Sequence, residues 1–263
     1  KKTDKQHILD TPDTYIGSIE NINQNSYVYD TEKSKIIEKN IDYNPGLYKL
    51  FDEGIVNCRD HAIRMKQLIN NQKDEKNFPV TNINISIDDD GVFTLYNDGN
   101  GIDVAKHPTE LDSIGDPIWI PSLILGELLT SKNYNKKGKT TGGKNGFGAK
   151  LVNLFSKWFK VETVDHIRGL KFVQEFKDNM SIKEKPKVTS VKGKPYTKIS
   201  WIADFNRFGL AEYTDKMYEL MERRLYDIAG VTDKSVNVYC NGKLIKHKTF
   251  NAYINMYLTN IYY

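Results

Sequence analysis

The apolar residues of this chain change from helical to alternating spacing, and this change most constrains the fold. Between positions 46 and 62 they recur every three or four residues, as on one face of an α-helix. The isoleucines of residues 83–87 then alternate with polar side chains, and an Asp-Asp-Gly turn follows. Val92, Thr94 and Tyr96 resume the alternation after that turn. A helix followed by a β-hairpin is therefore predicted.

The rest of the chain continues to mix helices with strands. Further helices are predicted at 121–129, from the glycine-rich segment to 155 and at 214–229, and further strands at 26–29, 35–40, 160–164, 170–176, 197–201 and 236–240. Because the helices interleave irregularly with hairpins, the order favours an α+β fold. We expect a mixed, mostly antiparallel sheet with helices packed on one face.

Composition sets broad limits on the class of protein. With 263 residues and 39% hydrophobic content, the chain can bury the core of one large or two small domains. A net charge of +4 is too weak by itself to indicate nucleic-acid binding. Lysines crowd residues 136–150 and 183–198, and we interpret the second group as a solvated loop.

The two cysteines, Cys58 and Cys240, lie far apart and form neither a disulfide framework nor a metal-binding spacing. This usage is typical of a reducing intracellular compartment. No apolar run approaches the length of a membrane span, and no secretory signal opens the chain. Because the sequence starts without Met, we expect it to be part of a longer protein.

A carboxylate and an amide lie one helical turn apart in the first predicted helix. Glu53 and Asn57 are four residues apart and so project from the same helix face. The carboxylate can polarise a water, and the amide oxygen can bind Mg²⁺, which prefers oxygen ligands. The alternative is a surface Glu and Asn on an ordinary helix, so the pair alone is a weak signal.

Two glycine-containing segments follow. In Asn-Asp-Gly-Asn-Gly, the segment from Asn97 to Gly101, an Asp acceptor can bind an adenine amine while glycines let the backbone pass close to a ring. An ordinary hairpin turn is the alternative. The glycine-rich segment 142–150 precedes a helix and holds two lysines, a combination suited to phosphates. A P-loop is the competing interpretation, and it is disfavoured because Asn145 stands where its Ser or Thr should be and no buried strand precedes the segment.

Taken in order, these motifs resemble the GHKL ATPase superfamily, whose fold is of the Bergerat type, and within it the ATPase domain of eukaryotic-type DNA topoisomerases II. The narrower resemblance rests on residues 12–18, 45–49, 128–131 and 226–230, outside the three motifs, and on residues 141–150, which include the glycine-rich one. It extends over almost the whole chain. The resemblance implies that residues 1–263 form one ATPase domain, beginning inside the arm exchanged between protomers and ending before the transducer domain.

The resemblance also implies roles for single residues. Glu53 matches the general base for the attacking water, and Asn57 matches the ligand of Mg²⁺. Asn97, Asp98 and Gly101 match positions around the adenosine, with Asp98 as the partner of the adenine amine. ATP and Mg²⁺ are the cofactors that these matches imply.

Further matches complete the implied ATP site. Thr197 matches a threonine that supports the adenine through water, and the segment that contacts ribose and phosphate matches Ser131, Lys132 and Asn133. The lid around the triphosphate matches Gly143, Lys144, Asn145, Gly146, Phe147, Gly148, Ala149 and Lys150.

Three of the matching positions depart from the family pattern. Lys132 replaces a small hydroxyl residue, and Phe147 lacks the hydroxyl of a common Tyr. Lys144 replaces a frequent Arg, which keeps the charge but loses the bidentate fork.

For the whole protein, the resemblance implies a type II DNA topoisomerase in which ATP-driven dimerisation couples hydrolysis to passage of one duplex through another. Its partners would be ATP, duplex DNA and a second copy, without a membrane, in the nucleus or a viral replication compartment. The chain alone is expected to be a monomer that binds ATP with little turnover. The alternatives are a GHKL chaperone or mismatch-repair clamp, and a nucleotide sensor without catalytic activity.

Overall fold

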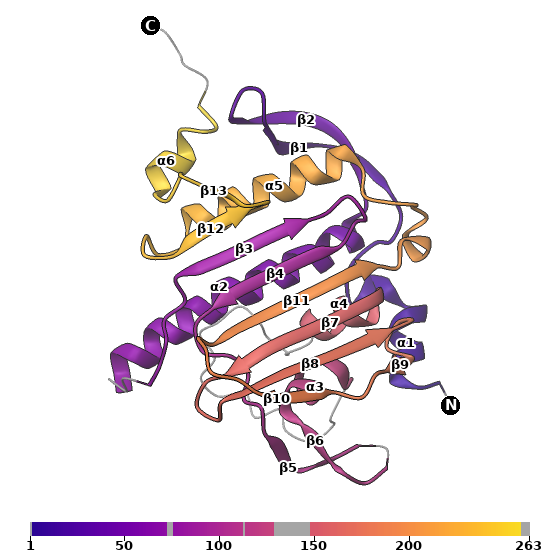
Figure 1. Cartoon of the computed structure of the whole chain (residues 1–263). Helices are drawn as coiled ribbons and strands as arrows, with labels where there is room; N and C mark the ends of the chain where they lie inside the picture. The colour runs from indigo at the N-terminus through magenta and orange to yellow at the C-terminus, as the bar shows by residue number, and fades with distance from the viewer. Residues whose placement is uncertain (1, 73–75, 113, 129–147, 259–263) are drawn as a thin grey trace, which may run out of the picture.

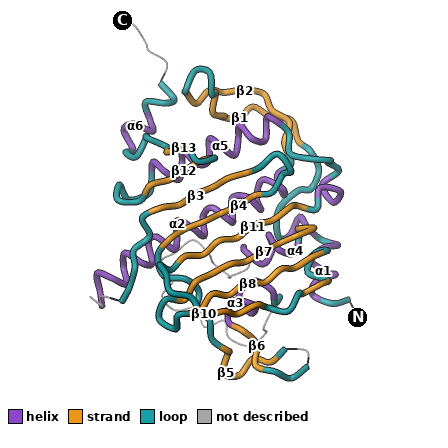
Figure 2. The backbone as a smooth tube through the Cα atoms, in the orientation of Figure 1, coloured by secondary structure: helices purple, strands orange, loops and turns teal. Residues whose placement is uncertain are grey.

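The computed structural model describes residues 2–72, 76–112, 114–128 and 148–258. Figures 1 and 2 show one large twisted sheet with helices packed behind it. Within the described ranges, none of the helices is long and apolar enough to cross a membrane.

Nine strands of the described part form the large sheet. Their order from one edge is β10 (Lys187–Ser190), β8 (Leu170–Lys177), β7 (Ser156–Asp165), β11 (Tyr196–Ala203), β4 (Phe93–Asp98), β3 (Asn82–Ile87), β12 (Asn237–Cys240) and β13 (Lys243–Leu244), with β9 (Ile182–Lys183) paired to β8. The pairing of β12 with β3 is parallel, and the other pairings in this sheet are antiparallel. The prediction of a mixed, mostly antiparallel sheet is confirmed.

The helices that shape the site lie behind the strands in Figure 1. They are α2 (Pro45–Gln72), α3 (Ile120–Gly126) and α4 (Gly148–Leu154). The helix α2 packs on β3 and β4 and contacts α4, and α4 in turn contacts α3. Helices on one face of the sheet are therefore confirmed, and the residues between α2 and the strands can form a shared site.

The remaining elements border this arrangement. A hairpin of β1 (Ile22–Asp30) and β2 (Lys35–Tyr43) packs on α5 (Asp215–Gly230), which also contacts α2. The others are α1 (Asp4–Asp10), the short 3₁₀ helices at Pro12–Thr14 and Phe205–Phe208, the β5 (Lys106–Leu111) and β6 (Pro117–Trp119) hairpin, and α6 (Phe250–Ile254).

Two sequence predictions about these elements need correction. Helical spacing was identified only for residues 46–62, but α2 continues to residue 72 because Met65 is buried and Leu68 packs on the core. The lysine-rich segment 183–198 was interpreted as a loop, but it contains β10 and the end of β9. These residues form strands because their backbones pair with β8, and the local sequence alone does not indicate that pairing.

An aromatic stack joins α2 to the centre of the sheet. The Phe51 ring of α2 lies 5.2 Å from the Phe93 ring of β4, and Phe93 stacks on Trp201 of β11 at 5.0 Å with an interplanar angle of 14°. All three side chains are at most 2% exposed. Such pairs add stacking energy to a large burial of apolar area.

Truncating the middle ring of this stack tests its contribution to stability. We expect Phe93→Ala to lower the free energy of unfolding by about 3–5 kcal/mol, since it leaves a cavity between two buried rings. Phe250→Ala is the matched control, because that ring is 59% exposed and its loss should cost about 0.5 kcal/mol or less. Urea titration of both variants measures the difference, and equal losses would contradict the packing described here.

Candidate functional site

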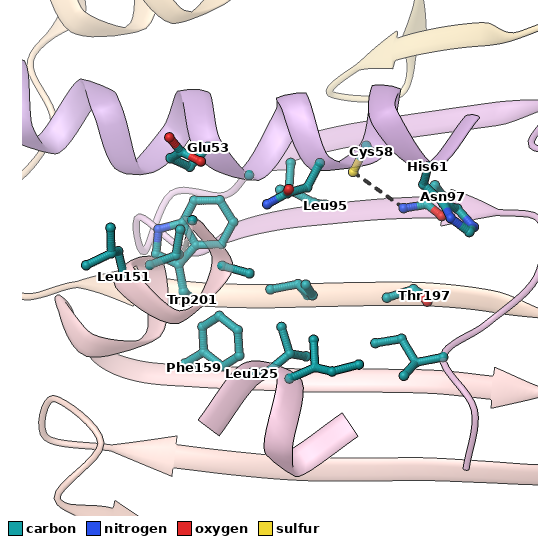
Figure 3. Close-up of a pocket in the computed structure, with 18 of the residues that line it drawn as sticks. Glu53, Cys58, His61, Leu95, Asn97, Leu125, Leu151, Phe159, Thr197 and Trp201 are labelled. Carbon is teal, nitrogen blue, oxygen red and sulfur yellow. Dashed lines mark hydrogen bonds between the residues drawn. The ribbon is translucent and has the colours of Figure 1, made fainter. Parts of the chain in front are cut away.

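A cavity of about 870 Å³ lies between α2, the sheet and the α3 and α4 helices. Figure 3 shows α2 along one side, with side chains of β4, β7 and β11 on the sheet behind and α3 on the opposite side. Leu95, Phe159, Ile199 and Trp201 give the sheet side an apolar surface. The size and the apolar lining suit a small organic ligand with a flat ring.

Glu53 and Asn57 both line this cavity from α2, as their four-residue spacing predicts. The Glu53 carboxylate pairs with Lys49, whose Nζ lies 2.7 Å from Oε1. The other oxygen, Oε2, lies close to the start of α4: a Cβ added to Gly148 would be 2.1 Å from it. Glycine at this position therefore lets the backbone of α4 approach the carboxylate.

Asn97 presents a buried hydrogen-bond acceptor to the cavity. The residue is 7% exposed, its Nδ2 donates to Cys58 Sγ at 3.5 Å, and its Oδ1 has no protein partner. A buried acceptor without a partner costs free energy. A ligand that carries an N–H group would satisfy it.

Asp98, by contrast, does not line the cavity. Its carboxylate accepts hydrogen bonds from the backbone N–H groups of Thr81 at 2.7 Å and Asn82 at 2.8 Å, and from both of their side chains. Successive side chains of a strand point to opposite faces, so Asp98 faces away once Asn97 faces in. This orientation does not fit the prediction that Asp98 receives an adenine amine, because the neighbouring Asn97 lines the cavity instead.

The phase of β4 explains this difference. Val92, Thr94 and Tyr96 were interpreted as the alternating set of this strand, which would place position 98 on the same face. In the structure the buried positions are 93, 95 and 97. The large apolar Phe93 and Leu95 are the signal that could have identified the inward face.

Thr197 lies directly opposite Asn97 in the register of β11 and β4. It lines the cavity, and its hydroxyl is 3.0 Å from that of Thr163 on β7. The Thr163 hydroxyl also accepts a hydrogen bond from the backbone N–H of Ile102 at 2.9 Å. These contacts hold the loop after β4 against β7 at the rim of the cavity.

Gly101 belongs to the same loop and lines the cavity. A Cβ added to it would lie 2.1 Å from the Val164 carbonyl oxygen and 2.8 Å from Thr163 Oγ1. A side chain here would force two backbone segments apart, so the position requires glycine.

The predicted lid falls mostly outside the described residues. Those that lie outside are Ser131, Lys132, Asn133, Gly143, Lys144, Asn145, Gly146 and Phe147. Gly148 and Ala149 line the cavity. Lys150 follows them on α4 but is not among the lining residues, and burial lowers the pKa of its amine.

The cavity also contains polar residues that were not predicted from the sequence, among them a thiol and an imidazole. Cys58 and His61 follow Asn57 on α2 and line the same cavity. Burial, and then the nearby Arg64, lower the pKa of His61 to about 4, so the ring is neutral near pH 7. Burial raises the pKa of the Cys58 thiol to about 11. The four-residue spacing of His61 from Asn57 was the available signal.

Comparisons with known proteins agree with this geometry. DNA topoisomerase 2 of Acanthamoeba polyphaga mimivirus is 44% identical over 264 residues, which cover 98% of this chain and 19% of that protein. The Saccharomyces cerevisiae enzyme is 42% identical over 261 residues, covering 97% of this chain and 17% of that one. The chain belongs to the DNA topoisomerase II family. It spans less than one fifth of the length of these relatives, and no protein-family model matches it.

Solved topoisomerase II structures locate the match. The crystal structure of the ATPase region of Saccharomyces cerevisiae topoisomerase II superimposes with a TM-score of 0.85 at 42% identity, covering 98% of this chain and 64% of that one. The ATPase and transducer domains of Balamuthia mandrillaris topoisomerase II give 0.83 at 37% identity, covering 98% and 62%. The predicted GHKL-type α+β fold is confirmed by these matches.

Adding a methyl group at Gly101 tests the close contact of the loop with β7. We expect Gly101→Ala to lower the free energy of unfolding by about 1–3 kcal/mol, because its Cβ meets a backbone carbonyl that cannot move alone. Gly193→Ala is the control, since a Cβ there meets nothing within 4 Å. Thermal unfolding compares the two, and a neutral Gly101→Ala would contradict the close approach.

Proposed function

We propose that this chain binds ATP with Mg²⁺ in the cavity behind the sheet and hydrolyses the γ-phosphate. The carrying observation is that side chains from two distant segments of the sequence line one cavity. Glu53 and Asn57 line it from α2, and Asn97, whose buried Oδ1 has no partner, lines it from β4. The family membership supports this reading over a chaperone or mismatch-repair clamp.

The adenine would bind at the Asn97 end of the cavity. Its exocyclic amine donates to Asn97 Oδ1, and its ring packs on the apolar side chains of Leu95 and Ile199. The Thr197 hydroxyl, opposite Asn97 in register, supports a bridging water to the ring. Gly101 leaves room for the base because it carries no side chain.

The phosphates would extend along α2 toward Glu53. An α-helix rises about 1.5 Å per residue, so Glu53 lies roughly 8 Å along the axis from Cys58, which contacts Asn97. Asn57 lies between them, and its amide oxygen is the type of ligand that Mg²⁺ accepts. When bound, Mg²⁺ would neutralise part of the negative charge of the phosphates. The described residues contain no cluster of three or more His, Cys, Asp or Glu side chains that could hold a metal, so phosphate and water oxygens would complete its ligands.

Glu53 would act as the general base. Its carboxylate takes a proton from the water that attacks the γ-phosphate. Lys49, paired with Oε1, fixes the orientation of the carboxylate and leaves Oε2 at the start of α4. Gly143 to Lys150 would form the lid over the triphosphate, with Ser131, Lys132 and Asn133 near the ribose and phosphates.

The whole protein would be an ATP-dependent type II DNA topoisomerase. Nucleotide-driven dimerisation of two such domains would close a gate, and hydrolysis would reopen it after one duplex has passed through another. Duplex DNA is then a partner of the full-length protein, which acts as a homodimer in the nucleus or a viral replication compartment. The isolated chain would bind ATP as a monomer with little turnover.

Separate substitutions of the two neighbouring polar residues at the end of β4 test the adenine contact. We expect Asn97→Ala to weaken ATP binding by roughly 1–3 kcal/mol, about five- to 150-fold in Kd, because the amine loses its acceptor. Asn97→Asp keeps an acceptor and should retain most of the affinity. Asp98→Asn is the matched control: it should lower stability by breaking bonds to Thr81 and Asn82, and leave Kd within about twofold. Calorimetric titration with a non-hydrolysable ATP analogue measures the Kd of each variant. If Asp98→Asn weakened binding more than Asn97→Ala, Asn97 would not be the adenine acceptor.

Removing the proposed base separates hydrolysis from binding. In the full-length protein, we expect Glu53→Gln to reduce ATP turnover at least about a hundredfold while ATP binding persists, because only proton abstraction is lost. Glu20→Gln, at an exposed position outside the cavity, should keep normal turnover. Phosphate release measures both variants. Normal turnover in Glu53→Gln would assign the base to another residue.

A further inference from the structure

Cys58 places a thiol in the wall of the nucleotide cavity. The residue follows Asn57 on α2, is 4% exposed and lines the same cavity as Glu53 (Figure 3). Its Sγ accepts the hydrogen bond from Asn97 Nδ2. The mechanism proposed above uses no thiol, so this nucleophile has no assigned role.

The neighbouring Asn97 indicates which part of a ligand would meet the thiol. The Oδ1 and Nδ2 of its amide are bonded to one carbon, and Nδ2 is the atom that contacts Cys58 Sγ. A ligand group that donates to the buried, unpartnered Oδ1 therefore lies near that sulfur. In the proposed orientation this group is the amine on C6 of the purine. The edge of the base that carries C6 then faces the part of the cavity wall that holds the thiol.

We propose that Cys58 is a covalent modification site for purine nucleotides that carry a leaving group at C6. The inference rests on the proposed function, since it uses the same orientation of the base. A 6-halopurine nucleotide lacks the amine but keeps the ring, ribose and triphosphate of ATP. Those groups would hold it in the same orientation and place its electrophilic C6 on the side of the cavity where the thiol lies.

The reaction balances without any further reactant. The Cys58 sulfur attacks C6 and forms a carbon–sulfur bond, the carbon–chlorine bond breaks, and chloride leaves with the bonding electron pair. The thiol proton passes to solvent, and a purine thioether remains on the protein. No oxidant or reductant takes part. Binding in the cavity supplies the proximity that makes such a bimolecular step fast.

The second cysteine is an internal control. Cys240 lies on β12, is half-buried and lines a separate cavity of about 70 Å³ beside Phe51 and Leu225. That volume is far below the 300–1,000 Å³ typical of small-molecule sites. A nucleotide therefore cannot bring C6 to Cys240, although small reagents from solution can reach either thiol. Selective reaction at Cys58 would require a nucleotide-sized cavity.

The test uses the purified chain, Mg²⁺ and 6-chloropurine riboside 5′-triphosphate. We expect one adduct per chain, mapped by mass spectrometry of peptides to Cys58. Its rate should saturate with probe concentration, fall as ATP occupies the site, and exceed the rate at Cys240 on the order of tenfold or more. Cys240→Ala should keep the adduct, and Cys58→Ala should lose it.

Calorimetric ATP binding on the same preparation separates the two levels of the hypothesis. If ATP binds but Cys58 stays unmodified, the inference is wrong and the proposed function stands. An adduct that forms at Cys240 equally fast, or that ATP does not slow, also overturns it. If ATP does not bind, the proposed function fails and the inference fails with it. Because the wild-type peptide map decides the site, misfolding of Cys58→Ala would not obscure the result.

Discussion

The close packing of α2 on the sheet is the contact on which the site depends. Gly54 faces β4 and β11: a Cβ there would lie 2.6 Å from Leu95 Cδ1 and 3.5 Å from the Trp201 ring. The helix can approach this closely because that side chain is missing. The approach brings Glu53, on one flank of Gly54, and Asn57, one turn further on, over the cavity beside the strands. A larger residue at position 54 would separate the two layers and widen or disrupt the cavity.

Ion pairs and hydrogen bonds link α2, which lines the cavity, to α5 and α6. Lys49 pairs with Glu53 at 2.7 Å and lies 3.7 Å from Asp52, and Asp52 accepts a hydrogen bond from Arg224 of α5 at 2.7 Å. On the same helix, Asp227 accepts a bond from the Tyr253 hydroxyl of α6 at 2.7 Å. Arg224 also lies 3.6 Å from Asp227, so these contacts form one connected network from Glu53 to α6. Transmission to α6 would require two stable arrangements of the network.

The local elements were largely predictable because short-range patterns specify them. Helical spacing located α2 and α5, although Thr214, predicted as the first helical residue, instead caps α5 with its hydroxyl. The pairing of β9 and β10 with β8 was missed, since edge strands rich in lysine have little apolar alternation. The length of α2 was underestimated because distant residues bury Met65.

The sequence by itself determined the residue types of the site and their spacing on single elements. Glu53 and Asn57 share a helix face because 3.6 residues make a turn, whatever surrounds the helix. Only the tertiary structure decided that Asn97 faces the cavity while Asp98 binds Thr81 and Asn82. A strand has two faces, and which one turns inward depends on what packs against it, so a one-residue change of phase exchanges the faces. Tertiary packing also decides that Cys58 lies beside Asn97, because the two residues meet only where α2 packs against β4.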